Sequence, residues 1–331
     1  MNALAFKLLR RLADGEFHSG AALAHALRVS RGTIWNGVRA IEAAGVAIYK
    51  VRGRGYRIAQ PLSLLDRDAI ENEMGGAASR FTLEIVDEVA STNTLLLERA
   101  AAGAPSGSVV AAEWQTHGRG RRGRAWHAGP AGALTFSIVW RFSQGAAGLS
   151  GLSLAAGVAL VRALGALDVP QVSLKWPNDL VWRGRKLAGI LIEMQGDALG
   201  PSAVVIGIGL NVRLSPDVAE AIDQPAVDLE TVCDGPVDRN RVLATLLREL
   251  AQVLEAFSAE GFAPLREEWQ RHHAHQDRVI DVELAAGKVT RGIARGVAED
   301  GALLVETGDR LERLHSGEVS VRATAPEPAA A

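Results

Sequence analysis

A glycine- and arginine-rich stretch between two apolar segments places the strongest constraint on how this chain can fold. Residues 113–126 read Glu-Trp-Gln-Thr-His-Gly-Arg-Gly-Arg-Arg-Gly-Arg-Ala-Trp, with four arginines within positions 119–124. Glycine lets the backbone approach a ligand closely, and clustered guanidinium groups favour an anion. Because apolar, strand-like segments flank the stretch, a disordered arginine–glycine tail is excluded. We predict an ordered cationic loop between two strands.

The three glycines of this loop also match the dinucleotide fingerprint G-x-G-x-x-G. That motif needs a helix after it and an acidic residue about 20 positions further on. Here the loop is followed by Gly129, Pro130 and Gly132, and then by the apolar run Leu134–Trp140, which is typical of a strand. The context that a dinucleotide site requires is therefore missing.

Length and composition indicate an ordinary soluble protein. A chain of 331 residues with 48% hydrophobic content can bury a large core, and its length predicts about two or three domains. The single Cys233 excludes an internal disulfide, and no charged-then-apolar leader opens the sequence, so a cytoplasmic location is expected. Apolar runs such as Val204–Leu210 are much shorter than the roughly 20 residues of a membrane helix, so no membrane partner is expected.

Positive charge is concentrated at the N-terminus. Residues 1–60 contain ten Lys or Arg against three Asp or Glu, a net charge of +7, and the remaining residues carry −9. A basic segment of this kind is typical of a polyanion binder.

The same segment has the pattern of a winged helix-turn-helix. Leucines at helical spacing predict a first helix before Gly15, and Ser19 and Ser30 are candidate N-caps of two more. Residues 48–58 then read as a hairpin with a basic turn. The third helix and the wing would present six residues to DNA: Arg31, Thr33, Asn36, Arg39, Arg52 and Arg54. Trp35 is left open as a packing residue or a contact, and a winged helix used only for protein contacts is the alternative.

Polar residues interrupt apolar segments in the middle of the chain. Ser91-Thr92-Asn93-Thr94 opens a helix, where Ser91 or Thr92 is a plain N-cap, a ligand-binding hydroxyl, or both. Residues 175–179, Lys-Trp-Pro-Asn-Asp, follow a strand-like segment. Such groups cost stability unless they are satisfied or used. We therefore expect a ligand site where these strands end.

The C-terminal sequence predicts a small all-β module. Short alternating segments at Val279–Leu284, Val289–Val297, Ala302–Glu306 and Arg310–Leu314 are separated by turn residues, including Ala286-Gly287. The preceding cluster of His272, His273 and His275 lacks a familiar set of metal ligands, so we interpret it as a solvated domain junction rather than a metal site.

Five motifs together resemble a biotin protein ligase. They are Ser91-Thr92-Asn93, Gln115 with the loop 118–124 and Trp126, residues 175–179, Arg185-Lys186-Leu187-Ala188-Gly189, and Gly207-Ile208-Gly209-Leu210-Asn211. Because a winged helix precedes them, the chain resembles the bifunctional type that also represses biotin biosynthesis genes. The resemblance covers positions 1 to 322.

The resemblance implies an α+β multidomain fold. Residues 1–62 would form a winged helix-turn-helix DNA-binding domain. Residues 63–276 would form a catalytic domain with a mixed sheet and helices, related to class II aminoacyl-tRNA synthetases. Residues 277–323 would form an SH3-like small β-barrel, and residues 324–331 a flexible tail.

The resemblance also implies a reaction and its residues. Biotin and ATP, with Mg²⁺, would give biotinyl-5'-AMP, and the biotin would pass to one lysine of the biotin carboxyl carrier protein of acetyl-CoA carboxylase. Lys186 and Arg121 match catalytic residues. Biotin-binding positions are matched by Ser91, Thr92, Asn93, Gln115, Gly118, Arg119, Arg121, Trp126, Lys186 and Gly189. ATP-binding positions are matched by Arg121, Lys175, Asp179, Asn211 and Arg322, with Asp179 also a candidate Mg²⁺ ligand.

The resemblance further implies that biotinyl-AMP is the corepressor, promoting a homodimer that binds operator DNA of biotin genes. One departure concerns the adenine, because Ala226 stands where the bifunctional enterobacterial form has a tryptophan. Two alternatives stay open: a DNA-binding regulator whose ligase-like domain only senses a small molecule, and a lipoyl ligase relative.

Overall fold

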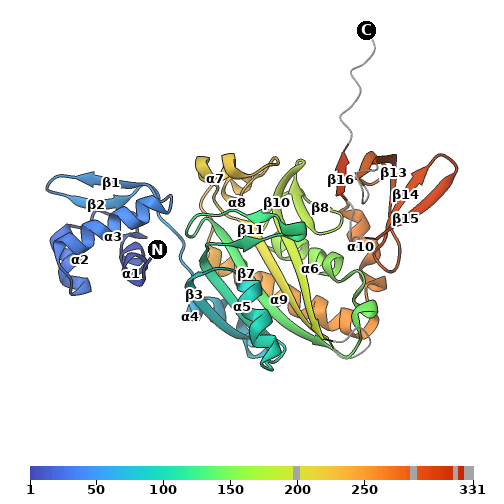
Figure 1. Ribbon diagram of the computed structural model, residues 1–331, viewed down its shortest axis with the longest axis horizontal. Helices are drawn as coiled ribbons and strands as arrows, with labels where there is room; N and C mark the ends of the chain where they lie inside the picture. Colours follow the sequence, from blue (N-terminus) through green and yellow to red (C-terminus); the bar gives the residue numbers. More distant parts are fainter. Residues whose placement is uncertain (197–201, 284–288, 316–319, 324–331) are drawn as a thin grey trace, which may run out of the picture.

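The N-terminal segment folds as predicted, into three helices and a hairpin (Figure 1). The computed structural model describes residues 1–196, 202–283, 289–315 and 320–323. The elements are α1 (Ala3–Leu12), α2 (Gly20–Leu27), α3 (Arg31–Ala43), β1 (Ile48–Val51) and β2 (Gly55–Ile58). The side chains of Ser19 and Ser30 accept hydrogen bonds from the main-chain N–H groups of Ala22 and Thr33, which confirms both predicted caps.

A small apolar core holds these helices together. It is built mainly from Leu8, Leu9 and Leu12 of α1 and from Ile34, Val38 and Ile41 of α3. Trp35 lies outside that core with 47% of its surface exposed, which leaves it on the outer face of α3. The third helix is thus fixed by its inner side and presents its polar side to solvent.

A seven-stranded mixed sheet forms the central part of the chain. Its strand order is β3-β4-β7-β11-β10-β9-β8, in which β3 and β4 are parallel and the other neighbours antiparallel. The strands are β3 (Thr82–Val89), β4 (Ser108–Gln115), β7 (Ala133–Phe142), β8 (Val172–Lys175), β9 (Asp179–Trp182), β10 (Arg185–Gly196) and β11 (Ser202–Asn211). The strand predicted at Leu134–Trp140 is confirmed within β7.

Helices cover both faces of this sheet (Figure 1). Val109 and Ala111 of β4 belong to the large core that includes α6 and α9, whereas Val110 belongs to a second cluster beneath α5. This alternation follows from the two-residue period of a strand. The helices and short 3₁₀ turns are α4 (Arg67–Met74), η1 (Gly75–Arg80), α5 (Thr92–Ala101), η3 (Ala146–Leu149), α6 (Leu152–Ala166), α7 (Pro216–Ala221), α8 (Leu229–Cys233), α9 (Arg239–Glu260), η4 (Ala263–Leu265) and α10 (Arg266–Arg271).

The cationic stretch forms a compact excursion between β4 and β7. It contains β5 (Gly118–Arg119) and β6 (Ala125–Trp126), which pair in antiparallel register, and the turn η2 (Arg121–Gly123) between them. The Gly120 N–H donates to the Arg124 carbonyl at 2.7 Å. The predicted ordered loop between two strands is confirmed.

The C-terminal residues form a five-stranded antiparallel sheet with order β15-β14-β13-β12-β16. Its strands are β12 (Val279–Glu283), β13 (Val289–Val297), β14 (Leu303–Thr307), β15 (Arg310–Leu314) and β16 (Ser320–Ala323). Its buried residues, such as Val282 and Leu303, join the large central core. The buried Trp176 indole donates to the Gly301 carbonyl at 3.0 Å, which also ties this sheet to the central part. Leu284, the turn at Ala286-Gly287 and the tail 324–331 lie outside the described residues.

The prediction of a solvated histidine junction is wrong for two of the three residues. His273 and His275 are each 8% exposed, and the His273 ring lies 4.6 Å from that of Trp269. The segment adds a bridge to the sheet edge, because the Leu174 N–H donates to the His272 carbonyl at 2.7 Å. Burial lowers the pKa of both His273 and His275 to about 4, so they are neutral at pH 7.

A buried ion pair lies beneath the linker that follows the winged helix. Glu113 and Arg239 meet at 2.5 Å with both side chains 1% exposed. Glu113 also accepts from the Leu65 N–H at 2.7 Å, and Arg239 donates to the carbonyls of Ser63 and Ala133. The linker is therefore attached to β4 and α9 by charged, buried groups. Among the residues in the four described ranges, no helix is long and apolar enough to cross a membrane.

Candidate active site

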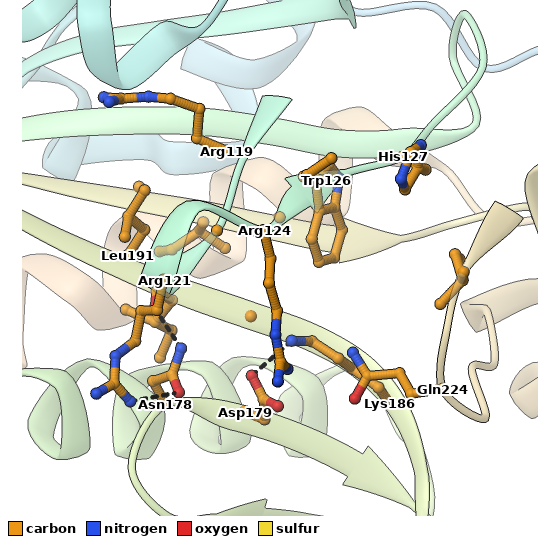
Figure 2. Close-up of a pocket in the computed structure, with 18 of the residues that line it drawn as sticks. Arg119, Arg121, Arg124, Trp126, His127, Asn178, Asp179, Lys186, Leu191 and Gln224 are labelled. Carbon is orange, nitrogen blue, oxygen red and sulfur yellow. Dashed lines mark hydrogen bonds and ion pairs between the residues drawn. The ribbon is translucent and has the colours of Figure 1, made fainter. Parts of the chain in front are cut away.

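The predicted binding residues converge on one cavity of about 360 Å³ (Figure 2). It lies over β10 and β11, between the cationic loop, the start of α5 and the segment before α8. The predicted residues that line it are Ser91, Thr92, Asn93, Gln115, Arg119, Arg121, Trp126, Lys175, Asp179, Lys186, Gly189 and Asn211. Of the remaining two, Gly118 is buried beside the cavity, and Arg322 is described only as a backbone position of β16 that pairs with Asp281.

Lys186 occupies the cavity wall as part of an ion pair. Its amine lies 2.7 Å from an Asp179 carboxylate oxygen, with the two side chains 20% and 16% exposed. It also lies 5.9 Å from the centre of a Trp126 ring. A Cβ on Gly189 would come within 3.2 Å of the Lys186 amine, so a side chain at position 189 would crowd it. Gly189 thus keeps the space in which this amine can reach a ligand.

The loop directs cations into the same cavity. Figure 2 shows Arg121 and Arg124 pointing toward the segment that carries Asn178 and Asp179. Arg121 donates to the Asn178 amide oxygen at 3.2 Å. Burial lowers the pKa of the Arg121 guanidinium; the Asp179 carboxylate opposes this shift, and repulsion from Arg122 and Arg124 adds to it. This crowded charge makes an anionic ligand favourable at this position.

Basic side chains outnumber acidic ones around the cavity. The lining includes Arg119, Arg121, Arg122, Arg124, Lys175 and Lys186, against Asp179 and Asp223. Two anions brought together here would find their mutual repulsion reduced.

A hydrogen-bonded network shapes the other end of the cavity. Gln115 Oε1 accepts from the Thr92 N–H at 2.7 Å and lies 3.0 Å from the Thr92 hydroxyl. That hydroxyl is 2.7 Å from the Ser137 hydroxyl, which donates to Asn93 Oδ1 at 2.5 Å. Ser91 caps α5 by accepting from the Thr94 N–H, so the N-cap interpretation is confirmed, and it also lines the cavity. Neutral donors and acceptors at this end suit a neutral polar ring rather than a phosphate.

Close packing over two glycines forms the apolar floor. A Cβ on Gly209 would lie 2.6 Å from the Trp126 indole, and one on Gly207 would lie 2.0 Å from Asn93 Oδ1. Only a residue without a side chain lets Trp126 and α5 approach β11 this closely. The Gly-Ile-Gly motif therefore serves as a platform for both ends of the cavity.

Comparison with known proteins agrees with this geometry. Sequence models match the HTH domain at residues 5–57, the Biotin/lipoate A/B protein ligase family at 86–211 and the Biotin protein ligase C terminal domain at 278–322. The bifunctional ligase/repressor BirA of Escherichia coli is 37% identical over 97% of this chain and 98% of its own length. The chain belongs to the biotin protein ligase family.

Two further members show how widely the likeness extends. The biotin--[acetyl-CoA-carboxylase] ligase of Mycobacterium tuberculosis is 37% identical over 77% of this chain and 95% of its own. A solved structure of the biotin protein ligase from Aquifex aeolicus in complex with biotin and ATP has 28% identity and a TM-score of 0.64. It covers 73% of this chain and 99% of that chain.

In this biotin protein ligase, the segment carrying Ala226 is tied to Lys186. The Lys186 N–H donates to the Pro225 carbonyl at 2.8 Å, and the Val227 N–H donates to the Lys186 carbonyl at 2.9 Å. Asn211 donates to the Val227 carbonyl at 3.0 Å, so part of its polar capacity holds this segment. Ile222, Gln224 and Ala226 also line the cavity.

Glu193 and Ser137 were not predicted as site residues, and Asn178 was predicted only as part of the segment 175–179. Glu193 accepts from Asn93, Ser137 donates to Asn93, and Asn178 accepts from Arg121, so each holds a predicted residue in place. Ser137 had a usable signal, because a hydroxyl inside the apolar run 134–140 costs stability unless it is paired. The sequence gives no such signal for Glu193, because it stands at the polar end of a strand and its partners are distant in sequence.

Most of the predicted DNA-facing residues are exposed to solvent. Arg31, Asn36, Arg39, Arg52 and Arg54 are exposed, whereas Thr33 is half-buried and its hydroxyl is 2.8 Å from that of Ser30. The Arg39 guanidinium stacks 4.9 Å from the Trp35 ring. Trp35 therefore supports a cation on the outer face of α3.

Proposed function

We propose that this protein forms biotinyl-5'-AMP from biotin and ATP and transfers the biotin to one lysine of a biotin carboxyl carrier protein. The observation that carries the proposal is the meeting of Lys186, Arg121 and the Gln115 network in one cavity, with cations at one end and neutral polar groups at the other. Family membership and the relative solved with biotin and ATP support the same pair of substrates.

The proposed reaction uses the cations to bring two anions together. A carboxylate oxygen of biotin attacks the α-phosphorus of ATP, the bond to the β-phosphate oxygen breaks, and pyrophosphate leaves. We assign Lys186 and Arg121 the role of reducing this repulsion and stabilising charge in the transition state. In the second step the carrier lysine, as a free amine, attacks the acyl carbon, AMP leaves, and an amide forms with loss of a proton.

The residues divide between the two substrates. We assign Ser91, Thr92, Gln115 and the backbone at Arg119 to the neutral ring of biotin, with Trp126 against its apolar part. Lys175 and Asn211 would lie on the nucleotide side, and Arg322 would reach the phosphates from the C-terminal sheet. We propose domain boundaries after residues 62, 276 and 323.

Mg²⁺ fits the site as a companion of the nucleotide. Within the described ranges, no group of three His, Cys, Asp or Glu side chains could hold a metal by itself. Mg²⁺ is usually bound by one or two carboxylates together with substrate phosphates. We assign that role to Asp179, and the ion would supply charge neutralisation of the departing pyrophosphate.

A labelling experiment tests the enzyme function. Purified protein, ATP and a carrier domain are incubated with biotin or with lipoate. The mass and the modified residue of the carrier are then determined by mass spectrometry. We expect one biotin on one lysine and no lipoate. Labelling by lipoate would favour the lipoyl ligase alternative, and no labelling with either acid would favour the sensor.

We also propose that the protein represses biotin genes in the cytoplasm, with biotinyl-AMP as corepressor and a homodimer as the DNA-binding form. The +7 charge of residues 1–60 and the exposed cations of α3 and the wing support this. Binding to operator DNA should weaken steeply with salt, because phosphate contacts release counterions.

A gel-shift titration on DNA upstream of the organism's own biotin genes tests the repressor. We expect a shift that strengthens with biotin plus ATP and that weakens in Arg31→Ala or Arg39→Ala while biotinylation is kept. A shift indifferent to biotin plus ATP would remove the coupling, and no specific shift would remove the repressor role.

A further inference from the structure

Glu193 joins the cationic loop to the floor of the cavity. Arg119 Nη2 lies 2.7 Å and 2.9 Å from its two carboxylate oxygens, and Asn93 Nδ2 donates to it at 2.8 Å. Arg119 belongs to β5 in the loop, Asn93 to α5 and Glu193 to β10. One carboxylate thus contacts both the loop and the start of α5. Figure 2 shows the Arg119 side chain running away from Arg121 and Arg124, which leaves it free of the cavity's centre.

The bonds continue from Glu193 to the amide of Gln115. Asn93 Oδ1 accepts from the Ser137 hydroxyl, and the Ser137 oxygen lies 2.7 Å from the Thr92 hydroxyl. The Thr92 N–H fixes Gln115 Oε1. The Thr92 hydroxyl lies between two oxygens, Gln115 Oε1 at 3.0 Å and the Ser137 oxygen at 2.7 Å, so its single proton can serve only one of them at a time.

The Thr92 main-chain N–H determines what Gln115 offers a ligand. Its Oε1 is already bonded to Thr92, so its Nε2 faces Gly118, where an added Cβ would lie 3.2 Å from that nitrogen. Asn93 has a partner at each polar end, Ser137 for its oxygen and Glu193 for its nitrogen. Asn93 is therefore a residue that positions others, and Gln115 is left as a donor toward the cavity.

We propose that Glu193 is a positioning residue for biotin, acting as a latch that ties the loop to β10 through Arg119 and, through Asn93, holds the start of α5, whose Thr92 N–H orients Gln115. The inference deepens the proposed function and rests on it for the identity of the ligand. The mechanical part, that Glu193 restrains the loop, concerns the protein alone and can be tested without any substrate.

Amide hydrogen exchange of residues 118–126 in protein without biotin or ATP tests the latch. Glu193→Gln removes the charge and keeps the shape, and Glu193→Ala removes both acceptors. Hydrogen bonds to charged groups are strong enough that we expect the loop to exchange about tenfold faster in Glu193→Ala, with a smaller increase in Glu193→Gln. The matched control is Glu84→Gln. Glu84 and Arg99 form a surface ion pair with an N–O distance of 2.5 Å, and neither residue lines the cavity. Its loop exchange should equal that of the parent.

A double variant separates the latch from general loosening. If Arg119 and Glu193 act through each other, Arg119→Ala with Glu193→Ala should exchange at nearly the rate of Glu193→Ala alone. The proposal would be overturned if loop exchange were unchanged in both Glu193 variants. It would also be overturned if the rate increase in the double variant equalled the product of the two single increases. Thermal unfolding of each variant shows whether the global fold is kept.

Biotin binding then tests the ligand part. By calorimetry and steady-state kinetics we expect Glu193→Ala to raise the biotin Kd and KM about tenfold, with a smaller change in kcat. A purely structural role would lower the active fraction and leave KM unchanged. If the parent binds no biotin, the proposed function fails, and loop exchange still decides the latch.

Discussion

The junction beneath the linker and the wall of the cavity each contain an acid–base pair, and the two pairs have almost equal lengths. Glu113 and Arg239 meet at 2.5 Å with 1% of each side chain exposed, and Asp179 and Lys186 meet at 2.7 Å with 16% and 20% exposed. The first pair is surrounded by main-chain partners from Ser63, Leu65 and Ala133. The second borders a cavity large enough for a ligand.

This difference assigns the two pairs to different tasks. A buried pair with fixed partners cannot exchange them without leaving a charge unsatisfied, so it holds elements together. A lysine at a cavity wall can turn from a carboxylate to an arriving anion at little cost, so it serves binding and chemistry. Breaking one pair at a time separates these tasks, and the expected effects differ in size.

The largest effect is expected from Arg239→Met. It leaves Glu113 as an unpaired buried charge, which typically costs about 3–5 kcal/mol of stability. Urea unfolding measures the loss, and Arg241→Met, an exposed change on the same helix, is the control. Adenylate formation per folded molecule should stay close to that of the parent. A stability equal to that of the control would contradict the structural role.

Lys186→Ala should lower activity and leave stability unchanged. Loss of a transition-state cation is typically worth several kcal/mol, so we expect adenylate formation to fall about a hundredfold or more while the melting temperature is kept. Rapid-quench measurement with labelled ATP gives the rate. Lys50→Ala is the matched control, because Lys50 pairs with Glu42 at the same 2.7 Å on the surface. A near-parental rate in Lys186→Ala would remove its assignment.

Arg121→Gly should act on retention of the adenylate. It removes a charged contact from the loop and adds backbone freedom, so biotinyl-AMP should escape about tenfold faster. Labelling of lysines on a bystander protein reports the escape. Arg183→Gly, at an exposed turn outside the cavity lining, should not cause it. An unchanged adenylate lifetime in Arg121→Gly would speak against a retention role.

A structural feature could be predicted from the sequence when the residues that determine it are close together along the chain. The N-caps Ser19, Ser30 and Ser91 are local, because a hydroxyl and the N–H three residues later belong to one turn, and all three are confirmed. The cationic loop was visible from composition and from its apolar flanks. The winged helix and the small β module were predicted from periodicity, whereas the catalytic fold and the set of cavity residues came from motif resemblance.

Partners set by strand register could not be predicted. Glu113 and Arg239 are 126 residues apart, and Asn93 and Glu193 are 100 apart. Nothing local indicates that such side chains meet until the strand order is known. The histidine junction was misread for the same reason, because burial of His273 and His275 depends on Trp269 and on the bridge to Leu174.

The buried histidines should make the stability of the folded protein depend on pH. Their pKa is about 4 in the folded protein against 6.5 ordinarily, so between these values the unfolded chain binds more protons and stability falls as pH falls. From pH 7 to pH 6 we expect a loss of about 0.7 kcal/mol for each histidine.

Urea unfolding at pH 7 and pH 6 measures this effect. His273→Gln should reduce the pH dependence, and His25→Gln, an exposed histidine of α2, should not. An equal loss of stability in the parent and in His273→Gln would exclude His273 as its source.

The central claim is that this cavity joins biotin to the α-phosphate of ATP before any carrier protein is involved. Exchange of labelled pyrophosphate into ATP, measured on the purified protein without carrier, tests it most directly, because exchange requires reversible adenylate formation. The account predicts exchange that depends on biotin, is absent with lipoate and is lost in Lys186→Ala. Exchange without biotin, equal exchange with lipoate, or no exchange with biotin would contradict it.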